Sequence, residues 1–275
     1  MTVFTLNGKR IEYCGDGDRT LLDFLRLSEG ITSAKDGCSR QAACGACMVE
    51  INGMAKLSCT QKMKFLQDAS VVTMEGIPEK VRDVIASAFV GKGAIQCGFC
   101  TPGFIMRAKV LFSENPNPTR EEIKKAISLN MCRCTGYVKI IEAIAEAFEN
   151  LRNGTGAEKP PIQAGIGRPL PKYGAFDTAI GKRKFINDMQ FDGMLHAALR
   201  FSDHPRAKVL KIDTAEASKV EGIIRIFTTG DVPGNLYTGL IFSDWPLMVA
   251  VGETTRYIGD VIAGVVAVDE AAARK

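Results

Sequence analysis

Alternating apolar and polar residues open the chain and recur after a cysteine-rich stretch. Residues 3–13 alternate about Asn7-Gly8, and residues 48–57 do so about Asn52-Gly53. Asn-Gly is a preferred dipeptide for two-residue hairpin turns, because both central positions take positive φ. The pattern therefore predicts two β-hairpins.

A helix and a further strand complete the expected first domain. The run from Thr20 places Leu21, Leu22, Phe24 and Leu25 on one helical face, with Thr20 as the N-cap. Residues 70–77 have the composition of a strand. A small sheet with one helix and a cysteine loop predicts a ferredoxin-like β-grasp domain over residues 1–77.

After Pro78 the apolar period changes from two to 3.6, which predicts helices. Thr101-Pro102 suggests an N-cap followed by proline at the first helical position, and Thr119 with Glu122 forms a capping-box pattern. A last amphipathic helix is expected at about 137–151. Four helices over residues 78–152 predict a compact bundle.

Residues 153–171 contain four glycines and four prolines, which predicts an interdomain linker. A third domain is expected over residues 172–275. Its strands are predicted at 193–201, 222–227 and 260–268, with a short helix at 214–220. The whole chain is therefore expected to have an α+β fold.

Charge and composition exclude several classes of function. The net charge of +4 is small, and the densest basic run is 182–184, so no nucleic-acid partner is expected. The N-terminus has no apolar stretch of signal-peptide length, and the apolar run 261–268 is too short to cross a bilayer. These features predict a cytoplasmic protein with no membrane partner.

Nine cysteines and only two histidines point to metal held by sulfur, because disulfides are rare in a reducing cytosol. The first set has three members on one glycine-containing loop and a fourth near a strand, which is typical of a plant-type [2Fe-2S] site. A structural zinc site is the alternative. The members of this set are Cys38, Cys44, Cys47 and Cys59.

The second set combines a C-x2-C pair with a C-x-C pair: Cys97, Cys100, Cys132 and Cys134. Each pair precedes a predicted helix, so two helix N-termini would direct N–H groups toward an anionic cluster. Four-thiolate iron–sulfur ligation suits the close C-x-C pair better than a zinc ribbon does. Cys14 has no partner in either set and is expected to be an ordinary thiol.

The segments QCGFCTPGFIM and NPNPTREEIKKAISLNMCRCTGYVKIIEAI resemble the iron–sulfur domains of xanthine dehydrogenases, aldehyde oxidoreductases and related molybdenum hydroxylases. The resemblance covers the first 150 residues. Residues 195–234 and 257–275 resemble the start of the family's molybdenum-binding portion, its a/b hammerhead domain. The fold implied is a β-grasp [2Fe-2S] domain, a four-helix [2Fe-2S] domain and a partial hammerhead domain.

The resemblance implies a role for each site residue. The first cysteine set would hold the cluster farther from molybdenum, and the second set the nearer one. Gln96 matches the glutamine that hydrogen-bonds the pterin, and Cys134 matches the ligand whose sulfur accepts a hydrogen bond from the pterin amine. Electrons would pass from molybdopterin through both clusters to a flavin. The glycine pairs of this chain lack a dinucleotide fingerprint, so FAD is expected on a partner subunit.

One departure from the family pattern concerns the first loop. The family usually has four residues between its first two loop cysteines, often with a glycine, whereas this chain has the five residues SRQAA. Without a glycine the loop lacks an easy positive-φ position, so we expect it to rearrange by bulging at Gln41.

The function implied is electron transfer during hydroxylation of a purine-like N-heterocycle or an aldehyde, in an enzyme whose molybdenum site lies mostly outside this chain. A stand-alone ferredoxin-like carrier is the alternative, although the segment after residue 172 argues against it. A zinc-stabilised scaffold is a third possibility. We expect residues 1–275 alone to show cluster redox chemistry without hydroxylation, since a molybdenum-binding continuation or subunit would be required.

Overall fold

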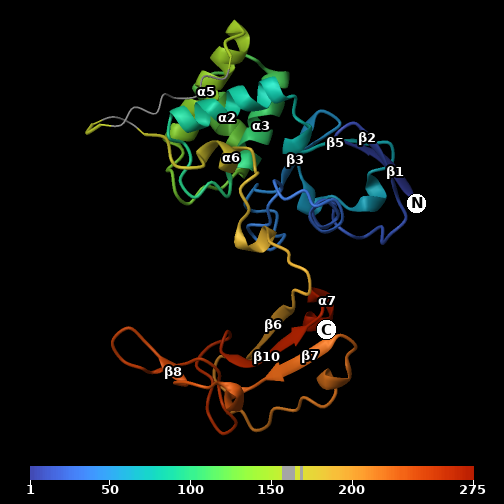
Figure 1. Cartoon of the computed structure of the whole chain (residues 1–275), viewed down its shortest axis with the longest axis vertical. Coiled ribbons are helices and arrows are strands. Elements are labelled where there is room, and N and C mark those ends of the chain that lie inside the picture. The colour runs from blue at the N-terminus through green and yellow to red at the C-terminus, as the bar shows by residue number, and fades with distance from the viewer. Residues whose placement is uncertain (157–164, 168–169) are drawn as a thin grey trace. The chain divides into compact units, whose positions relative to one another are not determined.

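The computed structural model describes residues 1–156, 165–167 and 170–275, and it forms two compact units (Figure 1). Unit 1 comprises Met1–Met189 and unit 2 comprises Gln190–Lys275. Part of the predicted linker, 157–164 and 168–169, lies outside the described residues. No helix in the described parts of the chain has the length and apolar character needed to span a bilayer.

Unit 1 begins with a five-stranded sheet in the order β2-β1-β5-β3-β4. Its strands are β1 Thr2–Leu6, β2 Lys9–Tyr13, β3 Met48–Ile51, β4 Met54–Leu57 and β5 Ser70–Val72. β1 pairs parallel with β5, and the other pairs are antiparallel. Asn7 and Asn52 have φ of 50° and 51° before their glycines, so both predicted hairpins are confirmed.

The helix of this domain packs its apolar side under the sheet. α1 Leu21–Asp23 continues as the π-helical segment η1 Phe24–Ser28, and the Thr20 side chain accepts the predicted capping bond from the Asp23 N–H at 3.2 Å. Phe24 packs edge-on against Phe4 and Tyr13 in the buried core. Three 3-10 segments follow: η2 Ser58–Thr60, η3 Met63–Phe65 and η4 Met74–Gly76.

The predicted strand at 70–77 is shorter than expected. β5 ends at Val72, and the chain then turns into η4. The side chain of Asn7 explains this end, because its Oδ1 accepts the Thr73 N–H at 2.9 Å and thereby takes a donor that a continuing strand would need.

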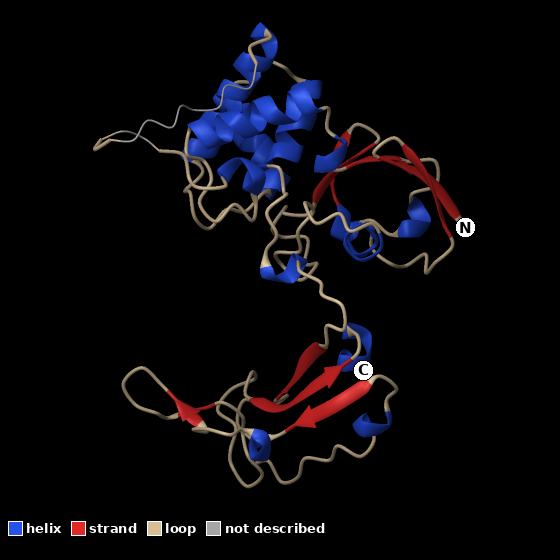
Figure 2. Cartoon of the chain, in the orientation of Figure 1, coloured by secondary structure: helices blue, strands red, loops and turns tan. Residues whose placement is uncertain are grey.

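Packed helices follow the sheet domain in unit 1 (Figure 2). They are α2 Glu79–Gly91, α3 Thr101–Glu114, α4 Arg120–Ala126, which runs on as η5 Ile127–Leu129, and α5 Val138–Asn153. The predicted capping box of Thr119 and Glu122 is present. The predicted N-cap at Thr101 is wrong: Cys100 already has near-helical φ and ψ of −82° and −14°, so the cap lies one residue earlier.

Unit 1 also includes the segment that follows the predicted linker. α6 Ala175–Ala179 and η6 Ile186–Asp188 lie in it, and Ala175, Ala179 and Ile180 are buried with the helical core. The break between units therefore follows Met189, whereas the sequence predicts a third domain from residue 172. The other predicted domain bounds stay predictions.

Unit 2 has a three-stranded antiparallel sheet in the order β6-β10-β7. The strands are β6 His196–Phe201, β7 Ile223–Phe227 and β10 Val261–Ala267, close to the predicted ranges. Its remaining elements are η7 Ala217–Lys219, η8 Thr229–Asp231, the short pair β8 Tyr237–Thr238 and β9 Trp245–Pro246, and α7 Glu270–Arg274.

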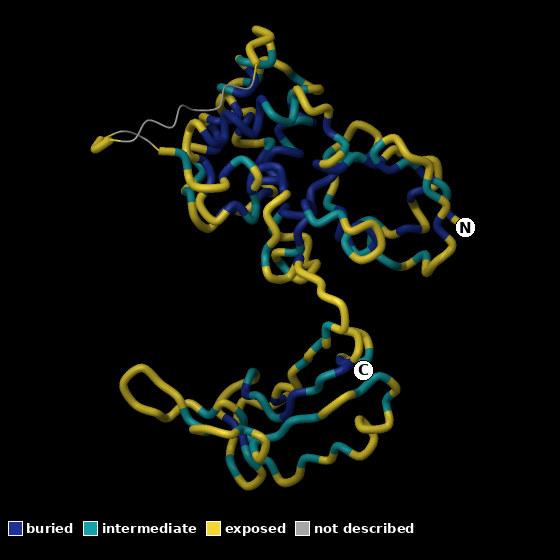
Figure 3. Tube along the Cα trace, viewed as in Figure 1, coloured by how far each residue is buried: buried dark blue, intermediate teal, exposed yellow. Residues whose placement is uncertain are grey.

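Unit 2 has long exposed stretches in its loops (Figure 3), and some apolar side chains of its sheet are also uncovered. Leu199, Phe201 and Ile224 are 54%, 46% and 57% exposed. Near the short strand pair, the Tyr237 hydroxyl and the Ala250 N–H donate hydrogen bonds to Glu253, and they hold the pKa of that carboxyl below its ordinary value.

Candidate iron–sulfur site

The first cysteine set converges from one loop and one 3-10 turn. Cys38, Cys44 and Cys47 precede β3, and Cys59 lies in η2 just after β4. The thiol of Cys44 donates to the sulfur of Cys38, and the thiol of Cys59 donates to the sulfur of Cys47. The four sulfurs thus meet as two pairs within unit 1.

Backbone N–H groups surround these sulfurs. Burial alone would raise the pKa of Cys38, but the N–H groups of Ala43, Cys44 and Gln41 and the thiol of Cys44 lower it below its ordinary value. Burial raises the pKa of Cys59 to about 12, with the neighbouring Cys47 adding to the effect. One sulfur of each pair therefore accepts hydrogen bonds from backbone N–H groups. Such donors stabilise the negative charge of a thiolate that binds an anionic cluster.

The five-residue stretch between Cys38 and Cys44 takes a left-handed backbone at three residues other than glycine. The φ angles of Ser39, Arg40 and Ala42 are 51°, 63° and 59°. Gln41, where the bulge was expected, does not have positive φ. The residues on either side of it take the left-handed backbone instead. Arg40 is tied down by hydrogen bonds, since its Nη2 lies 2.5 Å from Asp23 Oδ1 and its N–H lies 3.1 Å from Asp36 Oδ1.

The second cysteine set also meets as two pairs, and each pair takes one member from each motif. The Cys134 thiol donates to Cys97 over 3.5 Å, and the Cys100 thiol donates to Cys132. Burial raises the pKa of Cys100. Cys132 Sγ also lies 3.1 Å from the Thr135 hydroxyl, which helps to lower its pKa against the effect of burial.

Helix starts place the members of this set. Cys100 is the N-cap of α3, so its sulfur lies at a helix N-terminus. Cys132 is held before α5 by a hydrogen bond of 2.9 Å from its N–H to the hydroxyl of Tyr137, which is the N-cap of α5 with φ of 70°. N–H groups left free at a helix N-terminus favour a negative ligand.

The donor chemistry suits a binuclear cluster better than one metal ion. In a [2Fe-2S] cluster four cysteines act as two pairs, one pair per iron, whereas structural zinc takes four donors around one point. Pairwise contacts with donors aimed at sulfur therefore fit two iron–sulfur clusters.

The two cysteine sets are joined by a backbone hydrogen bond. The N–H of Met131, next to Cys132 in the chain, donates to the carbonyl of Cys44 over 2.9 Å. Buried Asn130 donates from its side chain to the carbonyl of Gly45 at 3.1 Å. Glycine is required at position 103, because a Cβ there would lie 2.5 Å from the Gly45 oxygen. The ligand loops of the two sets are thus in direct contact.

One face of the second set reaches the protein surface. Gln96, Cys97 and Cys134 are exposed, in contrast to the buried Cys132. The backbone carbonyl of Gln96 accepts a hydrogen bond from Lys172 Nζ, while its side-chain amide has no hydrogen bond to any described residue. Cys14 is exposed and belongs to neither set, and its role as an ordinary thiol stays a prediction.

Sequence reasoning missed a buried ion pair beside the first set. Lys35 and Asp188 have side chains that are 0% exposed, and Lys35 Nζ lies 2.5 Å from Asp188 Oδ2. Arg26 donates to the other carboxylate oxygen at 2.8 Å. The sequence shows only that Lys35 comes directly before the Asp-Gly-Cys of the loop. It does not indicate that this lysine is buried or that its partner lies 153 residues away.

Three family models match the chain in succession. Residues 4–70 match the model of a 2Fe-2S iron–sulfur cluster binding domain, and residues 73–145 match that of a [2Fe-2S] binding domain. Residues 180–275 match the a/b hammerhead domain of aldehyde oxidase and xanthine dehydrogenase. The predicted order of domains is confirmed.

Known proteins resemble the chain over its whole length or over its first half. It is 35% identical to an aldehyde oxidoreductase of Megalodesulfovibrio gigas, over 99% of this chain and 32% of that protein. It is 42% identical to the nicotinate dehydrogenase small FeS subunit of Eubacterium barkeri, over 54% of this chain and 94% of the subunit.

Solved structures agree with these relatives. The crystal structure of the aldehyde oxidoreductase from Desulfovibrio desulfuricans matches with a TM-score of 0.90 and 32% identity, over 99% of this chain and 32% of that one. The chain thus spans about a third of the length of the aldehyde oxidoreductases that it matches. This chain belongs to the molybdenum hydroxylase family of oxidoreductases, which includes the xanthine dehydrogenases and aldehyde oxidoreductases.

Proposed function

We propose that this chain is the iron–sulfur, electron-transfer part of a molybdenum-dependent hydroxylase. The observation that carries the proposal is the contact between two pairwise cysteine sets through the Met131–Cys44 hydrogen bond. Two redox sites joined by a short backbone route suit the passage of single electrons, and a stand-alone structural role requires no such route.

Each cysteine set would hold one [2Fe-2S] cluster, which supplies one-electron oxidation and reduction when bound. The first set would use Cys38, Cys44, Cys47 and Cys59. The second would use Cys97, Cys100, Cys132 and Cys134. The loop N–H groups and the start of α3 stabilise the thiolates, and the buried helical core around Cys132 keeps water away from that side of the second set.

We assign the exposed face at Gln96 and Cys134 to the pterin of the molybdenum cofactor. The side-chain amide of Gln96, which has no partner among the described residues, can both donate and accept hydrogen bonds, which is what recognition of a pterin edge requires. Electrons would enter the second set at this face, cross to the first set and leave toward FAD on a partner subunit.

Further protein is needed for the complete reaction. The chain spans 32% of the aldehyde oxidoreductase relatives, and exposed Leu199, Phe201 and Ile224 leave apolar surface in unit 2 for a molybdenum-binding continuation or subunit. The substrate class would be an aldehyde or a purine-like N-heterocycle.

The first test measures the clusters directly. The full chain, purified without oxygen and reconstituted with iron and sulfide, is expected to be red-brown and to bind about four irons. A colourless protein that binds zinc instead would refute the proposal.

The second test measures the route of electrons in the complete enzyme. Gln96→Ala is expected to weaken molybdopterin retention and to slow reduction of the second set's cluster by substrate. Gln190→Ala serves as the control, because Gln190 is exposed and outside both sets. Wild-type retention and reduction in the Gln96 variant would show that the pterin face is assigned wrongly.

A further inference from the structure

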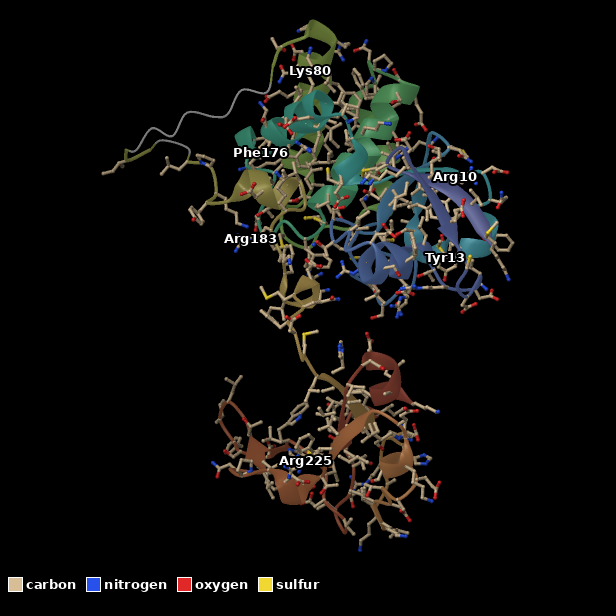
Figure 4. The ribbon with its side chains drawn as sticks, turned by 45° about the vertical axis from the view of Figure 1, so that its right-hand side comes forward. Arg10, Tyr13, Lys80, Phe176, Arg183 and Arg225 are labelled. Carbon is tan, nitrogen blue, oxygen red and sulfur yellow. The ribbon has the colours of Figure 1, made fainter. Side chains whose placement is uncertain are left out.

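The segment of residues 172–189, named the strap here, touches the ligand loops of both cysteine sets. It contains α6 and η6 and lies wholly in unit 1. Figure 4 labels Phe176, beside the helices, and Arg183, further along the strap. The strap supplies no cysteine ligand, so its contacts call for another explanation.

One end of the strap packs on the loop of the second set. Gly98 lies between Cys97 and Cys100, and a Cβ there would approach Thr178 Cγ2 of the strap to 2.0 Å. Lys172 Nζ donates to the carbonyl of Gln96, the residue before Cys97. Thr178 in turn is held by a hydrogen bond of 2.8 Å from its hydroxyl to the Gly174 carbonyl.

The other end packs on the loop of the first set through a buried ionic cluster. Asp188 accepts Lys35 Nζ at 2.5 Å and Arg26 Nη2 at 2.8 Å, and it also accepts the N–H of Phe185 at 2.9 Å. Lys35 is bound to the first set's loop, because its N–H donates to the Ala46 carbonyl over 3.1 Å. The anion that pairs with this lysine therefore comes from the strap.

Aromatic rings connect the two ends. The Phe185 ring packs edge-on against Phe99 with centroids 5.2 Å apart, and Lys35 Nζ lies 5.1 Å from the Phe185 centroid. Phe99 belongs to the second set's loop. A Cβ placed on Gly37 would be 3.1 Å from Phe99 Cε1 and 3.2 Å from Cys44 Sγ, so those two atoms are at most 6.3 Å apart.

We propose that the strap is a positioning element, in which Asp188 clamps Lys35 and Arg26 and so holds Phe185 on Phe99 between the two ligand loops. It rests on the proposed function, since it fixes the separation of two clusters that the cysteine sets would hold. A buried ion pair adds little net stability, but removing one of its partners is costly because the other charge is left buried alone. Such a pair therefore favours the one position of the strap in which Asp188 meets Lys35.

The test compares variants of the full chain in which the clamp is broken and then neutralised. Asp188→Asn leaves Lys35 buried without its anion, so the strap should open. Asp188→Asn with Lys35→Met removes both charges of the fully buried pair. Only Arg26 then lacks its anion, and its side chain is 12% exposed and can reach water, so most of the closed state should return. Asp177→Asn is the matched control, because Asp177 is exposed on the strap and its side chain has no partner among the described residues.

Hydrogen exchange reports the strap without reference to the clusters. In Asp188→Asn the amides of residues 175–189 should exchange about 150- to 5,000-fold faster, the change in the opening equilibrium that breaking a buried pair from one side produces. The double variant should recover most of the protection, and the Asp177 variant should match the wild type. Equal protection in Asp188→Asn and wild type would overturn the proposal, as would a double variant no better than the single one.

Electron paramagnetic resonance of the reduced, cluster-loaded chain reports the positioning itself. The magnetic splitting between two reduced clusters depends on their separation, so it should weaken or change in Asp188→Asn and return in the double variant. An unchanged splitting in an opened strap would refute the positioning role. Iron content separates this outcome from failure of the proposed function, which would instead show as missing clusters in the wild type.

Discussion

Gly98→Ala offers a sharp perturbation of the contact between the strap and the second set's loop. Gly98 has φ of 83°, and an added Cβ would lie 2.0 Å from Thr178 Cγ2 and 3.2 Å from Ile95 Cγ2. Gly93→Ala is the control, because Gly93 has φ of 63° and its nearest such contact is the flexible end of Lys139 at 3.4 Å. Both substitutions impose a left-handed backbone on alanine, but only the first forces the strap away.

The expected magnitudes follow from these two contributions. A left-handed alanine costs about 1–2 kcal/mol, and the less flexible unfolded chain offsets about 0.4–1 kcal/mol of it, so the expected loss for Gly93→Ala is about 0–1.6 kcal/mol. Overpacking adds about 1–3 kcal/mol at Gly98, which gives about 1–4.6 kcal/mol in total. Adding Thr178→Ala removes the clashing methyl group and should recover about 1–3 kcal/mol of the loss. Thr178→Ala alone must also be measured, because it loses the hydroxyl bond to Gly174.

Native-state hydrogen exchange suits this comparison, since it gives the free energy of local opening while the clusters stay bound. The amide of Ile180, which donates to the Phe176 carbonyl at 3.1 Å, reports α6. The reasoning is refuted if Gly98→Ala lowers the protection of Ile180 no more than Gly93→Ala does, or if Thr178→Ala fails to rescue it.

Three other predictions test separate features. Cys14→Ser should leave the iron content unchanged, and loss of about half the iron would make it a ligand. Ala42→Gly should slow loss of the cluster to a chelator, because it relieves about 1–2 kcal/mol of backbone strain in the folded loop and loses only about 0.4–1 kcal/mol to the more flexible unfolded chain. Ala43→Gly is the control and should not slow the loss, because Ala43 has no positive φ. The tyrosine hydroxyl and backbone N–H bound to Glu253 lower its pKa from 4.5, so their stabilisation is present above pH 4.5 and lost as pH falls through the folded value. Emission from Trp245, the single tryptophan, should therefore change below pH 4.5 in the wild type, and a change equally large in Glu253→Gln would count against this.

Local sequence signals predicted most elements of the fold. Asn-Gly dipeptides located both hairpins because their turn requires positive φ, and the Thr119–Glu122 pattern located α4 because both halves of a capping box lie within four residues. Cysteine spacing likewise indicated which residues would lie together, since close motifs need little tertiary information. The prediction at Thr101 was wrong by one residue, because Cys100 already has near-helical backbone angles and the helix begins one residue earlier.

Long-range partners could not be predicted from such signals. The apolar residues Ala175, Ala179 and Ile180 form too short a pattern to predict where the strap packs. Its contacts with the two ligand loops depend on Asp188 meeting Lys35 and on Thr178 meeting Gly98. No local sequence pattern indicates either contact, because the partners lie far apart in the chain. The left-handed residues of the first loop were missed for a different reason: the absence of glycine indicated a problem at Gln41, whereas the backbone absorbs it at Ser39, Arg40 and Ala42.

The way the sulfurs pair also sets an order for maturation. Cys38 and Cys44 are six positions apart in the chain, so a nascent or loosely folded loop can already present two neighbouring thiolates. In the second set each pair spans both motifs, and Cys97 meets Cys134, 37 positions away, only when α3 and α5 have packed together. Iron delivered early can therefore find a half-site in the first loop, whereas the second site comes into existence only with the finished helical bundle. A protein trapped before that packing would be expected to carry the first set's cluster alone.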